Sequence, residues 1–218
     1  MWRIIVLFLI ISISYLLCYN INALDLLFAQ LPYNFATKVF YGESHRWCWV
    51  IYYSVPIIVC VTILINLLII LSPSSIFYKH QFQYRKKQSL VVLLILLIGP
   101  GIIVNTFFKK NWGRPRPYQV LRDGATYRAF YQPNFEASGD NSFPSGHASI
   151  GFFLGTPILA INRRKFGILI SILFGTIIGI VRILQGGHFF SDVLFAGIIV
   201  WFVAELLHYL FKNKTYSN

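Results

Sequence analysis

The stretch Val181-Arg-Ile-Leu-Gln-Gly-Gly-His-Phe-Phe-Ser-Asp192 joins two apolar segments, which cover residues 167–185 and 190–211. Each segment has the roughly 17–25 residues that an α-helix needs to cross a bilayer. Gly186 and Gly187 permit a tight turn between them, because glycine adopts backbone conformations closed to other residues. The stretch therefore predicts a hairpin of two membrane helices that carries polar side chains at its tip.

More apolar segments precede this hairpin, so the sequence predicts an all-α fold, a six-span transmembrane helical bundle. A single integral membrane domain would then occupy residues 1–218. The first segment has an alternative reading as a cleaved signal peptide, but no clear small-residue cleavage site follows it. Two glycine pairs, Gly151-x3-Gly155 and Gly175-x3-Gly179, have the spacing that lets helices approach closely. The predicted spans are 3–20, 48–71, 89–108, 147–161, 167–185 and 190–211.

The composition also indicates a membrane protein. The chain is 56% hydrophobic and 12% charged, with a mean hydropathy of +0.63, whereas a soluble domain carries about 25% charged residues. The formal net charge is +12. Because the cations fall in loops between apolar segments, they favour a topology signal and contact with anionic lipid, and we expect no nucleic-acid partner.

The placement of Lys and Arg predicts the orientation of the chain in the membrane. The short loops 72–88 and 162–166 are basic and nearly free of acidic residues, which is the pattern of cytoplasmic loops. The long loop 109–146 would then face the outer side. Alternation of the spans places the turn at Gly186 on the same side, so the polar clusters of the chain would share one face.

Arg182, His188 and Asp192 lie around that turn. If the last helix begins near His188, Asp192 lies one turn further along on the same face. Its carboxylate can then accept a hydrogen bond from one imidazole nitrogen and leave the other nitrogen free to attack an electrophile. The alternative is an interfacial histidine beside a structural carboxylate.

A second cluster, Pro144-Ser145-Gly146-His147, leads into an apolar helix. The first turn of a helix presents unpaired N–H groups and a partial positive charge, which suit an anion. His147 in that turn can give a proton to a leaving oxygen. The alternative is ordinary helix capping, since serine is a common N-cap residue.

A third cluster is the basic stretch Lys109-Lys-Asn-Trp-Gly-Arg-Pro-Arg-Pro117. Arginine offers a planar fork to two phosphate oxygens, and lysine offers a point charge. Arg114 and Arg116 both precede a proline, so composition does not decide which of them binds. The alternative is a juxtamembrane stretch that contacts lipid headgroups.

Taken together, the three clusters resemble the type 2 phosphatidic acid phosphatase superfamily, whose pattern is KxxxxxxRP, PSGH and SRxxxxxHxxxD. Val181 stands where the pattern has serine, which removes one possible hydrogen bond to phosphate. The stretches Gly99–Arg116 and Arg182–Asp192 resemble, more narrowly, bacterial lipid A phosphatases of the 4'-phosphatase type. The resemblance implies a multi-pass enzyme of the bacterial inner membrane whose active site faces the periplasm.

The resemblance also implies a role for each site residue. His188 is implied as the nucleophile that becomes phosphohistidine, Asp192 as the group that orients it, and His147 as the acid for the leaving group. Because fixed cations meet the developing charge, we expect no metal and no other cofactor. The residues implied to hold the phosphate oxygens are Lys109, Arg116, Arg182, Ser145 and Gly146.

The sequence accordingly predicts a phosphatase whose partner is a lipid phosphate in the membrane, with lipid A and its 4'-phosphate ranked first. Undecaprenyl diphosphate and phosphatidylglycerophosphate are the alternative substrates. A lipid A phosphotransferase would use the same phosphohistidine with another acceptor. A non-catalytic transporter would not need a nucleophile, an orienting carboxylate and an acid. In the loop 118–143, we expect Arg122 and Arg128 to hold a second phosphate of the substrate.

Overall fold

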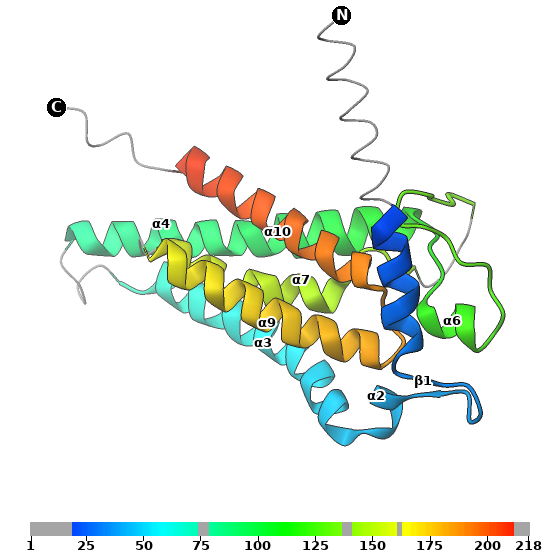
Figure 1. Ribbon diagram of the computed structural model, residues 1–218. Helices are drawn as coiled ribbons and strands as arrows, with labels where there is room; N and C mark the ends of the chain where they lie inside the picture. The colour runs from blue at the N-terminus through cyan, green and yellow to red at the C-terminus, as the bar shows by residue number, and fades with distance from the viewer. Residues whose placement is uncertain (1–18, 74–78, 137–140, 161–162, 212–218) are drawn as a thin grey trace, which may run out of the picture.

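The computed structural model describes residues 19–73, 79–136, 141–160 and 163–211, and its architecture is helical (Figure 1). A helix over residues 19–30 leads into an antiparallel pair of short strands, β1 (Tyr33–Asn34) and β2 (Val39–Phe40). The elements that follow are α2 (Tyr41–Ser44), α3 (Arg46–Leu71), α4 (Lys79–Leu96), η2 (Leu97–Phe108), α5 (Lys109–Asn111), α6 (Pro117–Leu121), α7 (Gly146–Phe153), α8 (Thr156–Ala160), α9 (Arg164–Leu184) and α10 (Phe190–Phe211).

Four helical stretches in the described residues are long and apolar enough to cross a membrane: α3, Tyr84–Asn111, α9 and α10. They coincide with the predicted spans 48–71, 89–108, 167–185 and 190–211, so the prediction of membrane helices is confirmed. The predicted span 3–20 falls almost entirely outside the described residues. The six-span count is therefore not reached within the part of the chain that the structure describes.

The predicted span 147–161 is not one long helix. It is divided into α7 and α8 by a turn at Leu154 and Gly155. α7 lies inside the bundle against α9, α10 and η2, and most of its residues are buried (Figure 1). A broken helix is tolerated at membrane depth where protein rather than lipid surrounds it. Because neighbouring helices shield α7 from lipid, this segment does not need the length of a helix that crosses the membrane surrounded by lipid.

The close approach of α7 to α9 depends on glycine. A Cβ atom on Gly151 would lie 2.7 Å from the carbonyl oxygen of Phe174 and 2.8 Å from Cα of Gly175. A Cβ atom on Gly155 would collide with the Gly167 carbonyl of α9. The predicted packing role of the Gly151-x3-Gly155 pair is confirmed, because no side chain fits between these backbones.

A π-helical stretch, η2, leads directly to the basic cluster at Lys109. Pro100 lies inside it and has no N–H to give to the helical ladder. The side chain of Asn105 donates from Nδ2 to the Pro100 carbonyl at 2.7 Å. π-helical turns recur at functional sites, and this one ends at Lys109.

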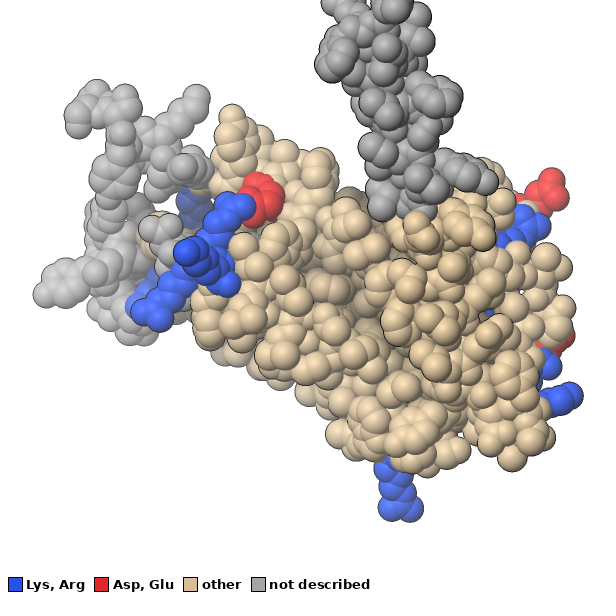
Figure 2. Space-filling view, in the orientation of Figure 1, with Lys and Arg blue, Asp and Glu red and all other residues tan. Residues whose placement is uncertain are grey.

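The outer surface of the bundle suits lipid contact. α3 is mostly exposed and apolar, with large side chains such as Val50, Ile57, Leu64 and Leu68 on its surface. Figure 2 shows a broad face without charged side chains and with Lys and Arg at its margins. An apolar belt bounded by cations is the surface that a bilayer requires.

Candidate active site

The three sequence clusters meet at one end of the bundle. The backbone N–H of Ser145 donates to the Asp192 carbonyl at 3.0 Å, which ties the start of α7 to the start of α10. The backbone N–H of Ser142 donates to the Arg114 carbonyl at 2.8 Å, which ties the same loop to the basic cluster. The predicted site residues therefore converge in space from α5, α7, α9 and the turn before α10.

His188 is 1% exposed and held by a backbone group that sequence reasoning missed. Its Nδ1 lies 2.7 Å from the carbonyl oxygen of Ser142. Because a carbonyl only accepts, Nδ1 carries the hydrogen and Nε2 keeps its lone pair. Burial, followed by the positive charges of Arg182, Arg116 and Lys109, holds the pKa of His188 well below its usual range. The ring is thus neutral at physiological pH, which is the state that a nucleophile needs.

Asp192 lies beside His188 but does not accept the hydrogen bond that the spacing predicts. Its Oδ2 is 3.6 Å from Nδ1 of His188, and that nitrogen donates to Ser142 instead. Oδ2 accepts from the backbone N–H of Phe189 at 2.8 Å. The carboxylate therefore acts on the imidazole through its charge and by fixing the turn that carries the ring, and its role as the orienting group stays a prediction.

A buried ion-pair network that the sequence analysis did not predict supports Asp192. Arg114 is fully buried and pairs with Asp192 at 2.5 Å and with Asp25 at 2.7 Å. Asp25 also accepts hydrogen bonds from the backbone N–H and the hydroxyl of Ser191, both at 2.7 Å. The network joins the helix over 19–30, the basic cluster and α10.

This network distinguishes the two arginines of the basic cluster. Arg114 is committed to two carboxylates, whereas the charge of Arg116 acts on both His147 and His188. The geometry is consistent with Arg116 as the phosphate-binding residue of the pair. One signal in the sequence pointed to Asp25: a carboxylate in an apolar stretch requires a partner.

Arg182 is held in place while part of its guanidinium keeps hydrogen-bonding capacity. Nη1 donates to Oε1 of Gln185 at 2.5 Å, and Cζ lies 4.7 Å from the centre of the Tyr52 ring. A Cβ atom on Gly187 would collide with the guanidinium, so glycine is required there. Nε is buried without a hydrogen-bond partner among the described residues. An oxyanion would satisfy such a donor.

The second cluster caps α7 and also brings a histidine close to cationic side chains, so both interpretations of its sequence apply. Ser145 is the N-cap, and its hydroxyl accepts from the Ala148 N–H at 3.3 Å. Gly146 lies against the amide of Asn105, because a Cβ atom there would collide with Oδ1. His147 stacks on Tyr52 and lies within reach of the charges of Lys109, Arg116 and Arg182. The cap thus fixes a helix start that faces the cationic residues.

The described residues contain no group of three or more His, Cys, Asp or Glu side chains that could hold a metal ion. Instead, the charges of Lys109, Arg116 and Arg182 act on both imidazoles of the site. A cationic cradle of this kind stabilises charge that develops on a phosphoryl group. The arrangement can therefore bind a phosphate and attack it from His188.

Comparison with known proteins identifies relatives of the chain. A family profile described as the PAP2 superfamily matches residues 89–216, which is more than half of the chain. The lipid A 4'-phosphatase of Francisella tularensis subsp. novicida (strain U112) is 34% identical over 202 residues, covering 88% of this chain and 87% of that protein. The lipid A 4'-phosphatase of Rhizobium leguminosarum is 32% identical over 52% of this chain and 51% of its own length.

A third relative, the lipid A 4'-phosphatase of Rhizobium etli, is 33% identical over 50% of this chain and 44% of its own length. No solved structure matches the chain. The family profile spans all three clusters that converge in the structure, from Lys109 to Asp192. The resemblance predicted from the motifs is confirmed: the chain belongs to the PAP2 superfamily, as a membrane-embedded phosphatase.

Proposed function

We propose that the protein removes the 4'-phosphate of lipid A at the periplasmic face of the inner membrane. The observation that carries this proposal is the buried, neutral His188 among three cations, in a chain that is 34% identical over 88% of its length to a lipid A 4'-phosphatase. The geometry of the site supports phosphoryl chemistry, and the similarity to this relative supports the choice of substrate.

The reaction runs in two steps. Nε2 of His188 gives its lone pair to phosphorus, the bond from phosphorus to the sugar oxygen breaks, and that oxygen takes a proton from His147. Water then attacks the phosphohistidine and gives a proton to His147. The P–N bond breaks, its electron pair returns to Nε2, and inorganic phosphate leaves. Lys109, Arg116 and Arg182 stabilise the charge in both steps.

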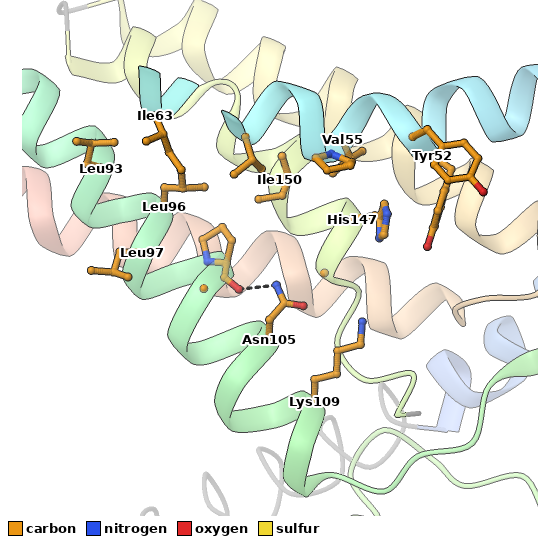
Figure 3. Close-up of a pocket in the computed structure, with 16 residues that line it drawn as sticks. Tyr52, Val55, Ile63, Leu93, Leu96, Leu97, Asn105, Lys109, His147 and Ile150 are labelled. Carbon is orange, nitrogen blue, oxygen red and sulfur yellow. Dashed lines mark hydrogen bonds between the residues drawn. The ribbon is translucent and has the colours of Figure 1, made fainter. Parts of the chain in front are cut away.

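An apolar cavity beside the site supports a lipid substrate. Its volume is about 780 Å³, and it lies between α3, the end of α4, η2 and α7. His147 and Lys109 stand at its polar end, and side chains such as Ile63, Leu93 and Leu97 line the rest (Figure 3). A phosphate bound near His147 would therefore have its apolar portion beside a matching surface.

Arg122 does not support the expectation of a second phosphate site. It pairs with Glu43 at 3.1 Å and with Asp123 at 3.3 Å, and its guanidinium lies 5.0 Å from the Tyr118 ring. An arginine with two carboxylate partners is a poor site for a further anion. The proposed function therefore requires only the phosphate site at His188 and His147.

The substrate is tested by incubating the purified protein with lipid A, undecaprenyl diphosphate and phosphatidylglycerophosphate and measuring the phosphate released from each. We expect the highest kcat/KM with lipid A. Faster hydrolysis of undecaprenyl diphosphate with intact lipid A would reject the proposed substrate and retain a lipid phosphatase. Transfer of the phosphate to another lipid without release would indicate a phosphotransferase.

The proposed topology places the site in the periplasm. α3, Tyr84–Asn111, α9 and α10 are long and apolar enough to cross the membrane, and α7 with α8 would return the chain across it between them. The predicted span 3–20, which lies almost entirely outside the described residues, would be the sixth crossing, in line with the basic loops 72–88 and 162–166 on the cytoplasmic side.

Cysteine labelling tests this topology. In a variant without native cysteines, Thr126→Cys should react with an impermeant maleimide in intact spheroplasts, because Thr126 is exposed at the site end. The matched control is Lys165→Cys, exposed at the start of α9, which should react only after lysis. The reverse pattern would place the site in the cytoplasm.

A further inference from the structure

The ring of Tyr52 lies against two groups of the site, although Tyr52 belongs to none of the three sequence clusters. Its centre is 4.3 Å from the centre of the His147 imidazole, and the two planes differ by 17°. Cζ of Arg182 lies 4.7 Å from the centre of the same ring. Figure 3 shows the Tyr52 and His147 side chains next to each other, with Lys109 reaching toward them from the end of η2.

We propose that Tyr52 is a positioning residue that stacks on the His147 imidazole and holds it in the orientation that proton transfer to the leaving oxygen requires. The inference rests on the proposed function, in which His147 is the acid. It concerns the aromatic face of Tyr52 and not its hydroxyl, since the stacked contact is made by the ring.

The charges around His147 explain why such a residue is needed. Lys109 from α5, Arg116 from the segment before α6 and Arg182 from α9 all act on the ring through their charges. His188, from the turn before α10, also interacts with His147. Within α7, residues 146–153 carry no other charged side chain. An imidazole among these long, flexible side chains requires a rigid neighbour that fixes the plane of its ring.

An aromatic face is such a neighbour. The negative face of the ring attracts cations, and the attraction grows where water is excluded. Tyr52 is partly buried and contacts both the imidazole and the guanidinium. Its removal should therefore leave the imidazole and the guanidinium free to change orientation.

The first test compares Tyr52→Phe with Tyr52→Leu in the purified protein. Phenylalanine keeps the aromatic face, so we expect its kcat on lipid A within about twofold of the parent. Leucine removes the face, so we expect kcat to fall about ten- to hundredfold with KM little changed, because a misplaced acid acts on the chemical step.

Tyr41→Leu is the matched control. Tyr41, in α2, stacks on His45 with ring centres 3.7 Å apart and planes 18° apart, and His45 belongs to none of the three clusters. Tyr41→Leu reproduces the loss of a tyrosine stacked on a histidine, and we expect unchanged kcat. An equal loss in Tyr41→Leu would attribute the Tyr52 effect to general destabilisation and overturn the inference.

The second test does not depend on the substrate. Histidine-labelled protein is measured by NMR with inorganic phosphate present, and His147→Gln assigns the His147 signal. The stacked ring of Tyr52 shifts this signal upfield, so Tyr52→Leu should remove the shift and Tyr52→Phe should keep it. If the parent leaves lipid A intact, the proposed substrate fails and this measurement still decides the role of Tyr52. Equal His147 shifts in all three proteins, or equal losses in the Phe and Leu variants, would overturn the inference.

Discussion

Replacing His188 with alanine is expected to lower phosphate release by at least about 10³-fold, because the nucleophile is lost and no neighbouring group can replace it. The side chain is buried, with Nδ1 fixed on the Ser142 carbonyl, so only Nε2 remains to attack. His147→Ala should cost about 10²–10⁴-fold, the usual contribution of a positioned acid. Both variants are measured as purified protein at matched concentration.

His208→Ala is the control for this pair. The Nδ1 atom of His208 also lies 2.7 Å from a backbone carbonyl, that of Ala204, but His208 is near the far end of α10. We expect it to keep parental turnover. Turnover within a few-fold of the parent in either His188→Ala or His147→Ala would remove that residue from the mechanism.

The second large effect separates the two neighbouring arginines. Arg114→Gln leaves Asp25 and Asp192 buried without their cation, and loss of one partner from a buried pair costs about 3–5 kcal/mol. We expect a marked fall in melting temperature and in the yield of folded protein in detergent. Arg116→Gln should keep the melting temperature near that of the parent and lose about 10²–10³-fold in turnover, as for the loss of one charge-stabilising donor.

The comparison is informative because the two substitutions are the same change two residues apart. A stable, active Arg114→Gln protein would contradict the structural role of the ion-pair network. A destabilised Arg116→Gln protein would assign Arg116 to the fold, and Lys109 and Arg182 would then have to bind the phosphate without it.

The sequence predicted the long helices well, because an apolar run of about 20 residues has few other stable arrangements. The predicted spans 48–71 and 190–211 differ from α3 and α10 by no more than two residues. The segment 147–161 departed from the prediction because its neighbours in the bundle, and not its own length, shelter it from lipid.

For the site, the sequence predicted only part of the arrangement. The meeting of the three clusters at one end of the bundle was predictable, because the order of the spans places them on one side of the membrane. The Ser142 carbonyl that holds His188 was not, since every residue has a carbonyl and only the fold selects one. The contacts of Asp25 with Arg114 and of Tyr52 with His147 join residues far apart in the chain. Such pairs carry no local pattern, so they appear only when the helices are assembled.

The most direct test of the central proposal is mass spectrometry of lipid A from cells that express the protein, with His188→Ala as the matched inactive variant. The proposal predicts that the parent lowers the mass of lipid A by one phosphate, that fragmentation places the loss at the 4' position, and that the variant leaves the lipid unchanged. Intact lipid A in cells that contain the folded parent, or loss of the phosphate at position 1 only, would contradict it.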